Sequence, residues 1–169
     1  MKTVAQVIGA KQTQGIVMIA PEDSVFDALK LMAEKNVGAL PVADASGRLV
    51  GIVSERDYAR KIVLQGRSSF VTPVSAIMTS KVITVEPRQS IRECMEIMTE
   101  KHLRHLPVLD EGRTVGLLSI GDVVKETMAE QDSLIQQLEQ YIRGERLARH
   151  APRRVGLLYG CYRGRSADA

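Results

Sequence analysis

The feature that most constrains the fold of this chain is a short motif that occurs twice. Residues 51–57 read Gly-Ile-Val-Ser-Glu-Arg-Asp, and residues 116–122 read Gly-Leu-Leu-Ser-Ile-Gly-Asp. Both copies contain Gly, two aliphatic residues, Ser, two variable residues and Asp. Each copy follows a second shared block, Leu-Pro-Val-x-Asp, at 40–44 and 106–110. Repetition at a fixed offset indicates one structural unit used twice, and two like units facing each other would form two like clefts.

The hydrophobic pattern predicts the same order of elements in both units: strand, helix, strand, strand, helix. In the first unit we expect a strand at 16–19, a helix that begins at Ser24, strands at 40–43 and 49–53, and a helix from Ser54 to about Leu64. In the second unit we expect a strand at 82–85, a helix capped by Ser90, strands at 106–109 and 114–118, and a helix that begins at Ser119. A unit this small buries little apolar surface alone. We therefore expect an α/β (α+β) fold in which two β-α-β-β-α repeats pack sheet to sheet about a pseudo-twofold axis.

The same pattern predicts five regions along the chain. They are an N-terminal helix and linker at 1–14, a first repeat at 15–64, a linker at 65–79, a second repeat at 80–143 and a basic tail at 144–169. The closing helix of the second repeat keeps an apolar stripe to Ile142, with a break expected near Asp132. Its far end would pack on a partner chain or on the N-terminal helix. The tail loses all periodicity, and we expect it to be largely disordered.

Composition excludes several classes of function. Residues 143–169 hold seven Arg against two acidic residues, a net charge of +5, whereas the rest of the chain carries −2, so the near-neutral body argues against nucleic-acid binding. No apolar run is long enough to span a membrane, and the first residues carry no signal-peptide stretch. The two cysteines indicate neither a disulfide framework nor a zinc site. We therefore expect a cytoplasmic protein with no membrane partner and no metal.

The repeated motif carries two interpretations. A strand ends, Ser begins a helix, and Asp lies in the first turn, where unpaired backbone N–H groups and the helix dipole suit a phosphate. The Asp carboxylate can accept two hydrogen bonds from a ribose diol, so the motif suits a nucleotide. The alternative is that Ser-x-x-Asp only caps the helix. The segment Ser24–Asp27 has the same spacing without a preceding Gly, and the motif alone favours capping.

A pair of basic residues shifts this balance toward a ligand. Arg104 and His105 stand at the turn that enters a buried strand, where the first repeat has Gly38 and Ala39. Arg offers a planar fork to phosphate oxygens, and His105 donates more strongly below its reference pKa of about 6.5. The alternative is that both side chains simply face solvent.

The two blocks together resemble a tandem pair of CBS (cystathionine β-synthase) domains, the regulatory Bateman module. The resemblance covers about residues 10–143, and it is close to small stand-alone bacterial CBS-pair proteins because Gly-Ile-Val-Ser-Glu-Arg-Asp-Tyr is present at 51–58. It implies a module that binds adenine nucleotides (AMP, ADP, ATP, or NAD or S-adenosylmethionine) in clefts between the repeats. It implies no covalent cofactor, no catalytic residue and no metal ligand.

The resemblance also implies two crossed sites. In one, Asp122 would hold a ribose with Ser119 and Gly121 near the phosphate, and the adenine pocket would be formed by Ile19, Ala20, Val37, Gly38 and Ala39. The other would use Ser54, Arg56 and Asp57, closed by Thr84, Leu103, Arg104 and His105. Because Gly38-Ala39 supplies no second basic pair, the affinity for phosphate would be unequal between the sites.

The sequence leaves three candidate functions to compare. The first is a regulatory module that senses adenine nucleotides and passes the signal by changing the angle between its faces. The second is a scaffold without a ligand, whose repeats only build a dimer surface. The third is an enzyme, which the sequence disfavours because no general base is matched to a nucleophile. The resemblance further implies a homodimer, with the apolar stripes of the closing helices as its face.

Overall fold

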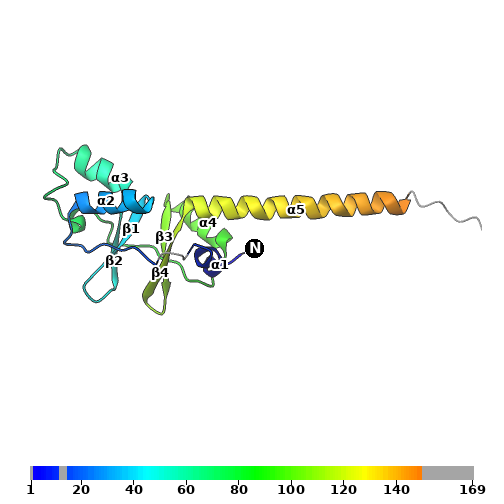
Figure 1. Cartoon of the computed structure of the whole chain (residues 1–169), viewed down its shortest axis with the longest axis horizontal. Helices are drawn as coiled ribbons and strands as arrows, with labels where there is room; N and C mark the ends of the chain where they lie inside the picture. Colours follow the sequence, from blue (N-terminus) through cyan, green and yellow to red (C-terminus); the bar gives the residue numbers. More distant parts are fainter. Residues whose placement is uncertain (1, 12–14, 150–169) are drawn as a thin grey trace, which may run out of the picture. The chain divides into compact units, whose positions relative to one another are not determined.

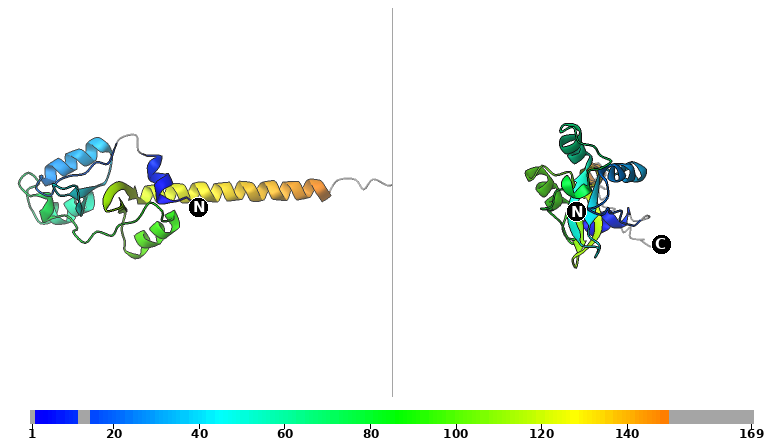
Figure 2. Two further views of the ribbon diagram at one scale, coloured as in Figure 1. Left: turned by 90° about the horizontal axis from the view of Figure 1, so that it is seen from below. Right: turned by 90° about the vertical axis from the view of Figure 1, so that its left-hand side faces the viewer.

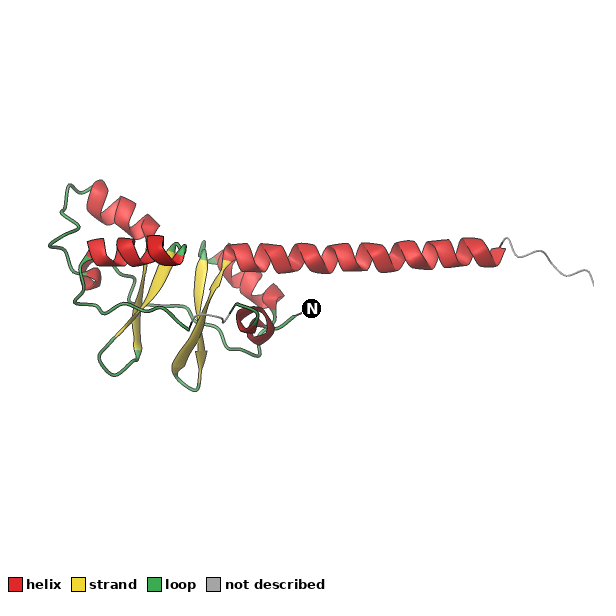
Figure 3. Cartoon of the chain, viewed as in Figure 1, coloured by secondary structure: helices red, strands yellow, loops and turns green. Residues whose placement is uncertain are grey.

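Two β-hairpins form the centre of the fold in this computed structural model, which describes residues 2–11 and 15–149. Strand β1 (Ala39–Ala43) pairs antiparallel with β2 (Leu49–Ser54), and β3 (His105–Asp110) pairs antiparallel with β4 (Arg113–Ser119). The hairpins face each other (Figures 1 and 3), and in the end-on view of Figure 2 one lies in front of the other. The packing of two like hairpins is the arrangement that the repeated sequence predicts.

Each hairpin is covered by helices whose apolar side faces it. Helix α2 (Val25–Lys35) buries Val25, Ala28 and Met32 in the first repeat, and α4 (Ile91–Glu100) buries Ile91, Cys94 and Met98 in the second. Ser24 and Ser90 cap these helices by accepting hydrogen bonds from the backbone N–H three residues later, as expected from their positions. The burial of Cys94 agrees with its interpretation as a small apolar residue, and burial raises the pKa of its thiol to about 11.

The segment before each repeat completes the core of the other repeat. Helix α1 (Val4–Gly9) precedes the first repeat but buries Val4 and Ile8 in the core of the second. The 3₁₀ turn η2 (Val74–Ala76) precedes the second repeat, and Val74 belongs to the core of the first. Both segments make an equivalent hydrogen bond to the residue before the Ser that caps the helix of the other repeat. The Val4 N–H donates to the Gln89 carbonyl at 2.9 Å, and the Val74 N–H donates to the Asp23 carbonyl at 2.8 Å. This exchange ties the two repeats into one unit.

The motif glycines allow these segments to approach. A Cβ at Gly51 would lie 2.5 Å from the Met78 Sδ and 3.2 Å from the Thr79 carbonyl oxygen. A Cβ at Gly116 would lie 3.1 Å from the Ile8 Cδ1. The Gly of Gly-x-x-Ser-x-x-Asp therefore serves packing, because it admits the linker against β2 and α1 against β4.

The first strand expected in each repeat is much shorter than the sequence indicated. Only Ile19 and Val85 pair there, each through a single parallel bridge to Val42 and Val108 respectively. Pro21 and Pro87 follow two residues later and cannot donate to a sheet, so the pairing does not continue past them.

The helices that follow the motif also differ from expectation. Helix α3 (Glu55–Tyr58) continues as a five-residue π-helix, η1 (Ala59–Val63), so the predicted helix from Ser54 is present but changes its winding. Helix α5 (Ile120–Arg149) runs through Asp132 without the predicted break. The helix extends to Arg149 and so includes residues 144–149, the first six of the expected tail. The rest of the tail, 150–169 with Cys161, lies outside the described residues.

The chain divides into two compact units, residues 1–131 and 132–169. The first holds both repeats. In the second, the described apolar side chains Leu134, Ile135, Leu138 and Ile142 are all more than half exposed. No helix in the described part of the chain combines the length and the apolar character needed to cross a membrane.

Candidate functional site

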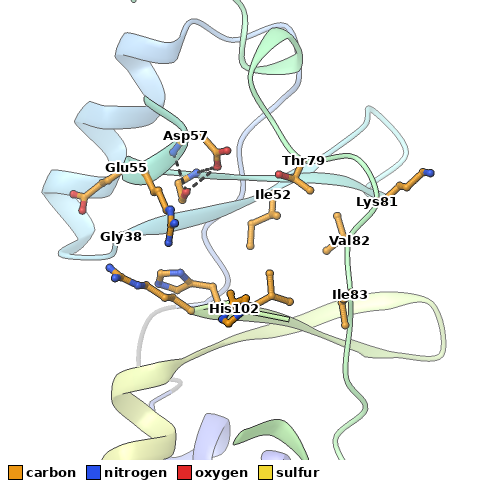
Figure 4. Close-up of a pocket in the computed structure, with 14 residues that line it drawn as sticks. Gly38, Ile52, Glu55, Asp57, Thr79, Lys81, Val82, Ile83 and His102 are labelled. Carbon is orange, nitrogen blue, oxygen red and sulfur yellow. Dashed lines mark hydrogen bonds between the residues drawn. The ribbon is translucent and has the colours of Figure 1, made fainter. Parts of the chain in front are cut away.

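A cavity of about 480 Å³ lies between the two repeats, beside the motif of the first (Figure 4). The first repeat contributes Gly38, just before β1, the end of β2 and the start of α3. The second repeat contributes the segment before β3 with His105, the first residue of that strand, and the stretch from Thr79, at the end of the linker, to Ile83 forms a further wall. The lining residues are Gly38, Ile52, Ser54, Glu55, Arg56, Asp57, Thr79, Lys81, Val82, Ile83, His102, Leu103, Arg104 and His105.

Asp57 is held at the cavity by the motif itself. Strand β2 ends at Ser54, which caps α3. The Asp57 Oδ2 accepts hydrogen bonds from the Ser54 N–H at 3.0 Å and from the Ser54 hydroxyl at 2.7 Å (dashed in Figure 4). The Asp57 N–H donates to the Ser54 Oγ at 3.2 Å. The carboxylate is therefore fixed in position before any ligand arrives.

Lys61 balances the charge of Asp57 from its own helix. The Lys61 Nζ lies 2.9 Å from the Asp57 Oδ1 and donates to the Ile77 carbonyl at 2.6 Å. Lys61 stands in the π-helical segment and does not line the cavity, whereas Asp57 does. The ion pair therefore fixes the carboxylate while leaving it on the cavity wall.

The wall of the cavity has an apolar part and a cationic part. In Figure 4, Val82 and Ile83 lie on the side opposite Glu55. Arg56, Lys81 and Arg104 are exposed cationic side chains at the same cavity. Such a combination suits a ligand with a flat apolar group and an anionic group.

His105 lies at the centre, between the two repeats. Its ring is next to Gly38, where an added Cβ would lie 3.6 Å from the His105 Cε1 and 3.6 Å from the Glu55 Oε2. Burial lowers the pKa of His105; the nearby Asp122 opposes this effect, and Lys11 and Arg104 add to it. The imidazole is therefore neutral near pH 7.

Asp122 repeats the geometry of Asp57 but meets a different partner. Its Oδ2 accepts hydrogen bonds from the Ser119 N–H at 2.8 Å and from the Ser119 hydroxyl at 2.6 Å. The same oxygen accepts a hydrogen bond from the Lys11 ammonium, which follows α1. Burial acts to raise the pKa of Asp122, but the hydrogen bonds from Lys11 and Ser119 outweigh it and hold that pKa below its usual value.

The structure confirms the interpretation that the Ser and Asp of the motif cap a helix. Ser54 with Asp57 forms a reciprocal capping box, and Ser90 with Glu93 forms one as well. The bonds within the motif therefore do not distinguish a ligand site from a helix cap. What distinguishes Asp57 is that its side chain also lines a cavity.

The structure brings together part of the expected set of site residues. Seven of the fifteen line the cavity: Gly38, Ser54, Arg56, Asp57, Leu103, Arg104 and His105. The other eight do not line it: Ile19, Ala20, Val37, Ala39, Thr84, Ser119, Gly121 and Asp122. All but Thr84 of these eight belong to the expected second site, around Asp122. Gly38, which was expected at that second site, lies at the Asp57 cavity instead.

Two lysines near the motif carboxylates were missed from the sequence. Lys81 lines the cavity, and Lys11 contacts Asp122. Residues 4–11 read Val-Ala-Gln-Val-Ile-Gly-Ala-Lys, and residues 74–81 read Val-Ser-Ala-Ile-Met-Thr-Ser-Lys. At this offset of 70, Ile8 and Met78 are equivalent positions, and each packs on one of the motif glycines. Extending the repeat search upstream of each unit would have found both lysines.

Comparisons with known proteins agree with this architecture. The family model of the CBS domain matches residues 7–64 and 74–129. The mitochondrial CBS domain-containing protein CBSX3 of Arabidopsis thaliana is 45% identical over 127 residues, which are 73% of this chain and 62% of that protein. The chain thus spans less than two thirds of that relative.

Solved structures show the same fold. A CBS-domain protein from Burkholderia ambifaria is 57% identical with a TM-score of 0.72, and the match covers 77% of this chain and 96% of that one. A CBS domain protein from Pyrobaculum aerophilum, solved in complex with AMP, is 26% identical with a TM-score of 0.64, and the match covers 72% of this chain and 89% of that one. With two family matches over facing β-hairpins that enclose a shared cavity, this chain belongs to the CBS-domain family as a tandem pair of CBS domains.

Proposed function

We propose that this chain is a regulatory module that binds an adenine nucleotide, AMP, ADP, ATP or NAD, in the cavity beside Asp57. The observation that carries the proposal is a fixed carboxylate on the wall of a cavity that also presents cations and an apolar surface. A volume of about 480 Å³ lies within the range of roughly 300–1,000 Å³ typical of small-molecule sites. The AMP complex of the Pyrobaculum relative supports the choice of ligand.

Each part of the nucleotide has a matching group. The adenine would lie against Ile52, Val82 and Leu103, which line the apolar part of the cavity. The ribose hydroxyls would donate to Asp57, because a carboxylate accepts and a diol donates. The phosphate would lie near Arg56 and Arg104, since guanidinium groups bind phosphate oxygens in a planar, two-point manner.

A thermal-shift screen tests this proposal. At a hundredfold excess over its dissociation constant, a ligand stabilises the folded state by about 2.7 kcal/mol, which corresponds to a Tm increase of roughly 5–10 °C for a chain of this size. We expect that increase with at least one of AMP, ADP, ATP, NAD and S-adenosylmethionine. Asp57→Ala should remove it. The absence of any shift at millimolar nucleotide would favour the scaffold function instead.

We also propose that the module acts as a homodimer through its closing helices. Val63 and Leu64 at the end of η1 are 56% and 79% exposed, and Val124 and Met128 on α5 are 49% and 59% exposed. Apolar side chains at this exposure on both closing helices would be covered by a second copy. Light scattering after size exclusion should give twice the monomer mass, and a monomer mass would contradict this proposal. The cytoplasmic location stays a prediction.

A further inference from the structure

The two motif carboxylates are neutralised by lysines from different places. Asp57 pairs with Lys61, four residues later on its own helix. Four residues after Asp122 the chain has Glu126, so the same pair cannot form in the second repeat. Glu126 is itself paired with Lys2, at 3.0 Å. The position that holds a cation in the first repeat holds an anion in the second.

This reversal of charge explains why Lys11 contacts Asp122. Lys11 and Lys81 occupy equivalent positions in the segments that precede the repeats. In the first repeat Lys61 pairs with Asp57, and Lys81 lies on the cavity wall. Asp122 has no lysine four residues later on its own helix, and the Lys11 ammonium donates to the oxygen that Ser119 also binds.

The contact is held in place by the packing of α1. Ile8 is buried against Gly116 of β4, and the Lys11 N–H donates to the Ile8 carbonyl at 3.0 Å, which fixes the backbone just past the helix. The Asp122 side chain is 13% exposed and that of Lys11 is 49% exposed. An ion pair with one half-exposed partner is weak enough to be displaced.

We propose that Lys11 is an internal competitor for the Asp122 carboxylate, so that the chain binds adenine nucleotide more tightly at Asp57 than at Asp122. The Lys11 ammonium holds the Asp122 Oδ2 that a ribose diol would also approach, and its counterpart Lys81 lines the cavity at Asp57. Lys61, by contrast, pairs with Asp57 without lining that cavity. This inference rests on the proposed function, because it assigns to one of two equivalent sites the ligand proposed there. Lys11 thereby determines which of the two sites is filled.

The test measures AMP affinity by calorimetry with the Asp57 site blocked. The full chain carrying Asp57→Ala reports the Asp122 site, and addition of Lys11→Ala should tighten AMP binding roughly fivefold, the upper end of what a partly exposed ion pair contributes. Lys2→Ala in the same background is the matched control, since it removes a lysine from the same segment that pairs with Glu126, and it should leave AMP affinity unchanged. Glu126→Lys should act like Lys11→Ala, because it supplies Asp122 with a partner on its own helix.

Several outcomes overturn the proposal. Unchanged affinity in the Lys11→Ala chain means that the lysine does not compete, and weaker binding means that it holds the ligand. A second measurement, independent of nucleotide, is the carboxyl pKa of Asp122 by NMR, which should rise in Lys11→Ala; if it does not move, the ion pair is absent in solution and the inference fails. If that pKa rises but no variant and no wild-type chain binds nucleotide, the ion pair stands while both the competition and the proposed function fail. If the wild type binds nucleotide through Asp57 and Lys11→Ala changes nothing, only the competition fails.

Discussion

Replacing Gly51 by Ala tests whether the first motif glycine exists to admit the linker. The added Cβ would lie 2.5 Å from the Met78 Sδ and 3.2 Å from the Thr79 carbonyl oxygen. The Met78 side chain can turn away, but the Thr79 backbone is held by two hydrogen bonds with Ile52, of 3.0 and 2.9 Å. The strand and the linker must therefore move apart by a few tenths of an ångström.

The magnitude follows from two opposing effects. Overpacking of this kind costs about 1–3 kcal/mol, and replacing Gly by Ala restricts the unfolded chain, which contributes about 0.4–1 kcal/mol in the opposite direction. The net loss in the free energy of unfolding should be about 1–2 kcal/mol. Gly116→Ala is the matched control, because the three atoms nearest to the added Cβ all belong to the Ile8 side chain, the closest at 3.1 Å. Its net effect should lie within about 0.5 kcal/mol of zero.

Urea unfolding followed by far-UV circular dichroism measures this difference, since the chain has no Trp. With a slope of about 2 kcal/mol per molar urea, Gly51→Ala should lower the midpoint by roughly 0.5–1 M, and Gly116→Ala should move it little. Equal midpoints for the two variants, or a more stable Gly51→Ala chain, would refute the packing argument.

Two further predictions concern titratable groups and one concerns the core. Because burial lowers the pKa of folded His105, the unfolded chain binds more protons below about pH 6.5, and the free energy of unfolding should fall as the pH drops through that value. The substitution His105→Gln should flatten this part of a plot of urea midpoint against pH. An unchanged plot would contradict burial of the ring. The buried Cys94 thiol, with its pKa raised to about 11, should react with a thiol reagent at pH 8 only after unfolding, and rapid reaction of the folded protein, with Cys161 first replaced by Ser, would contradict that. Leu106→Ala, at a fully buried position of β3, should cost about 2–5 kcal/mol in chemical denaturation, and a loss below 1 kcal/mol would show that the core can collapse there.

The repeat made the fold predictable from the sequence. Two copies of one motif at a constant spacing fixed the hairpins, their helix caps and their facing arrangement, because these features depend on local turn and cap chemistry. The first strand of each repeat was overestimated. A short apolar run before a Pro has the composition of a strand whether one of its residues or all four pair with a neighbour. The number of residues that pair depends on the neighbouring strand, which the local sequence does not describe.

The site was predictable in its centre and less so at its edge. Asp57 and Arg104 were found because each stands in a motif or at an unusual turn position. Lys81 and Val82 were missed because the repeat comparison did not extend upstream of each unit, and because the packing of Met78 and Thr79 on Gly51, which precedes them in the chain, is a tertiary contact. The expected second site around Asp122 includes a contact with Lys11, and the position four residues after Asp122 on α5 is Glu126 rather than a lysine. That contact joins residues 111 positions apart and required the structure.

The central claim is that the Asp57 carboxylate binds the ribose of a nucleotide in the cavity between the repeats. The direct measurement compares the affinities of AMP and its 2′,3′-dideoxy analogue for the wild-type chain and for Asp57→Ala. Hydrogen bonds to a charged group contribute about 1.5–3 kcal/mol, so the wild type should bind AMP roughly 10- to 150-fold more tightly than the analogue, and Asp57→Ala should bind the two with nearly equal affinity. Equal affinities for the wild type, or a preference for AMP that persists in Asp57→Ala, would contradict the assignment of the ribose to Asp57.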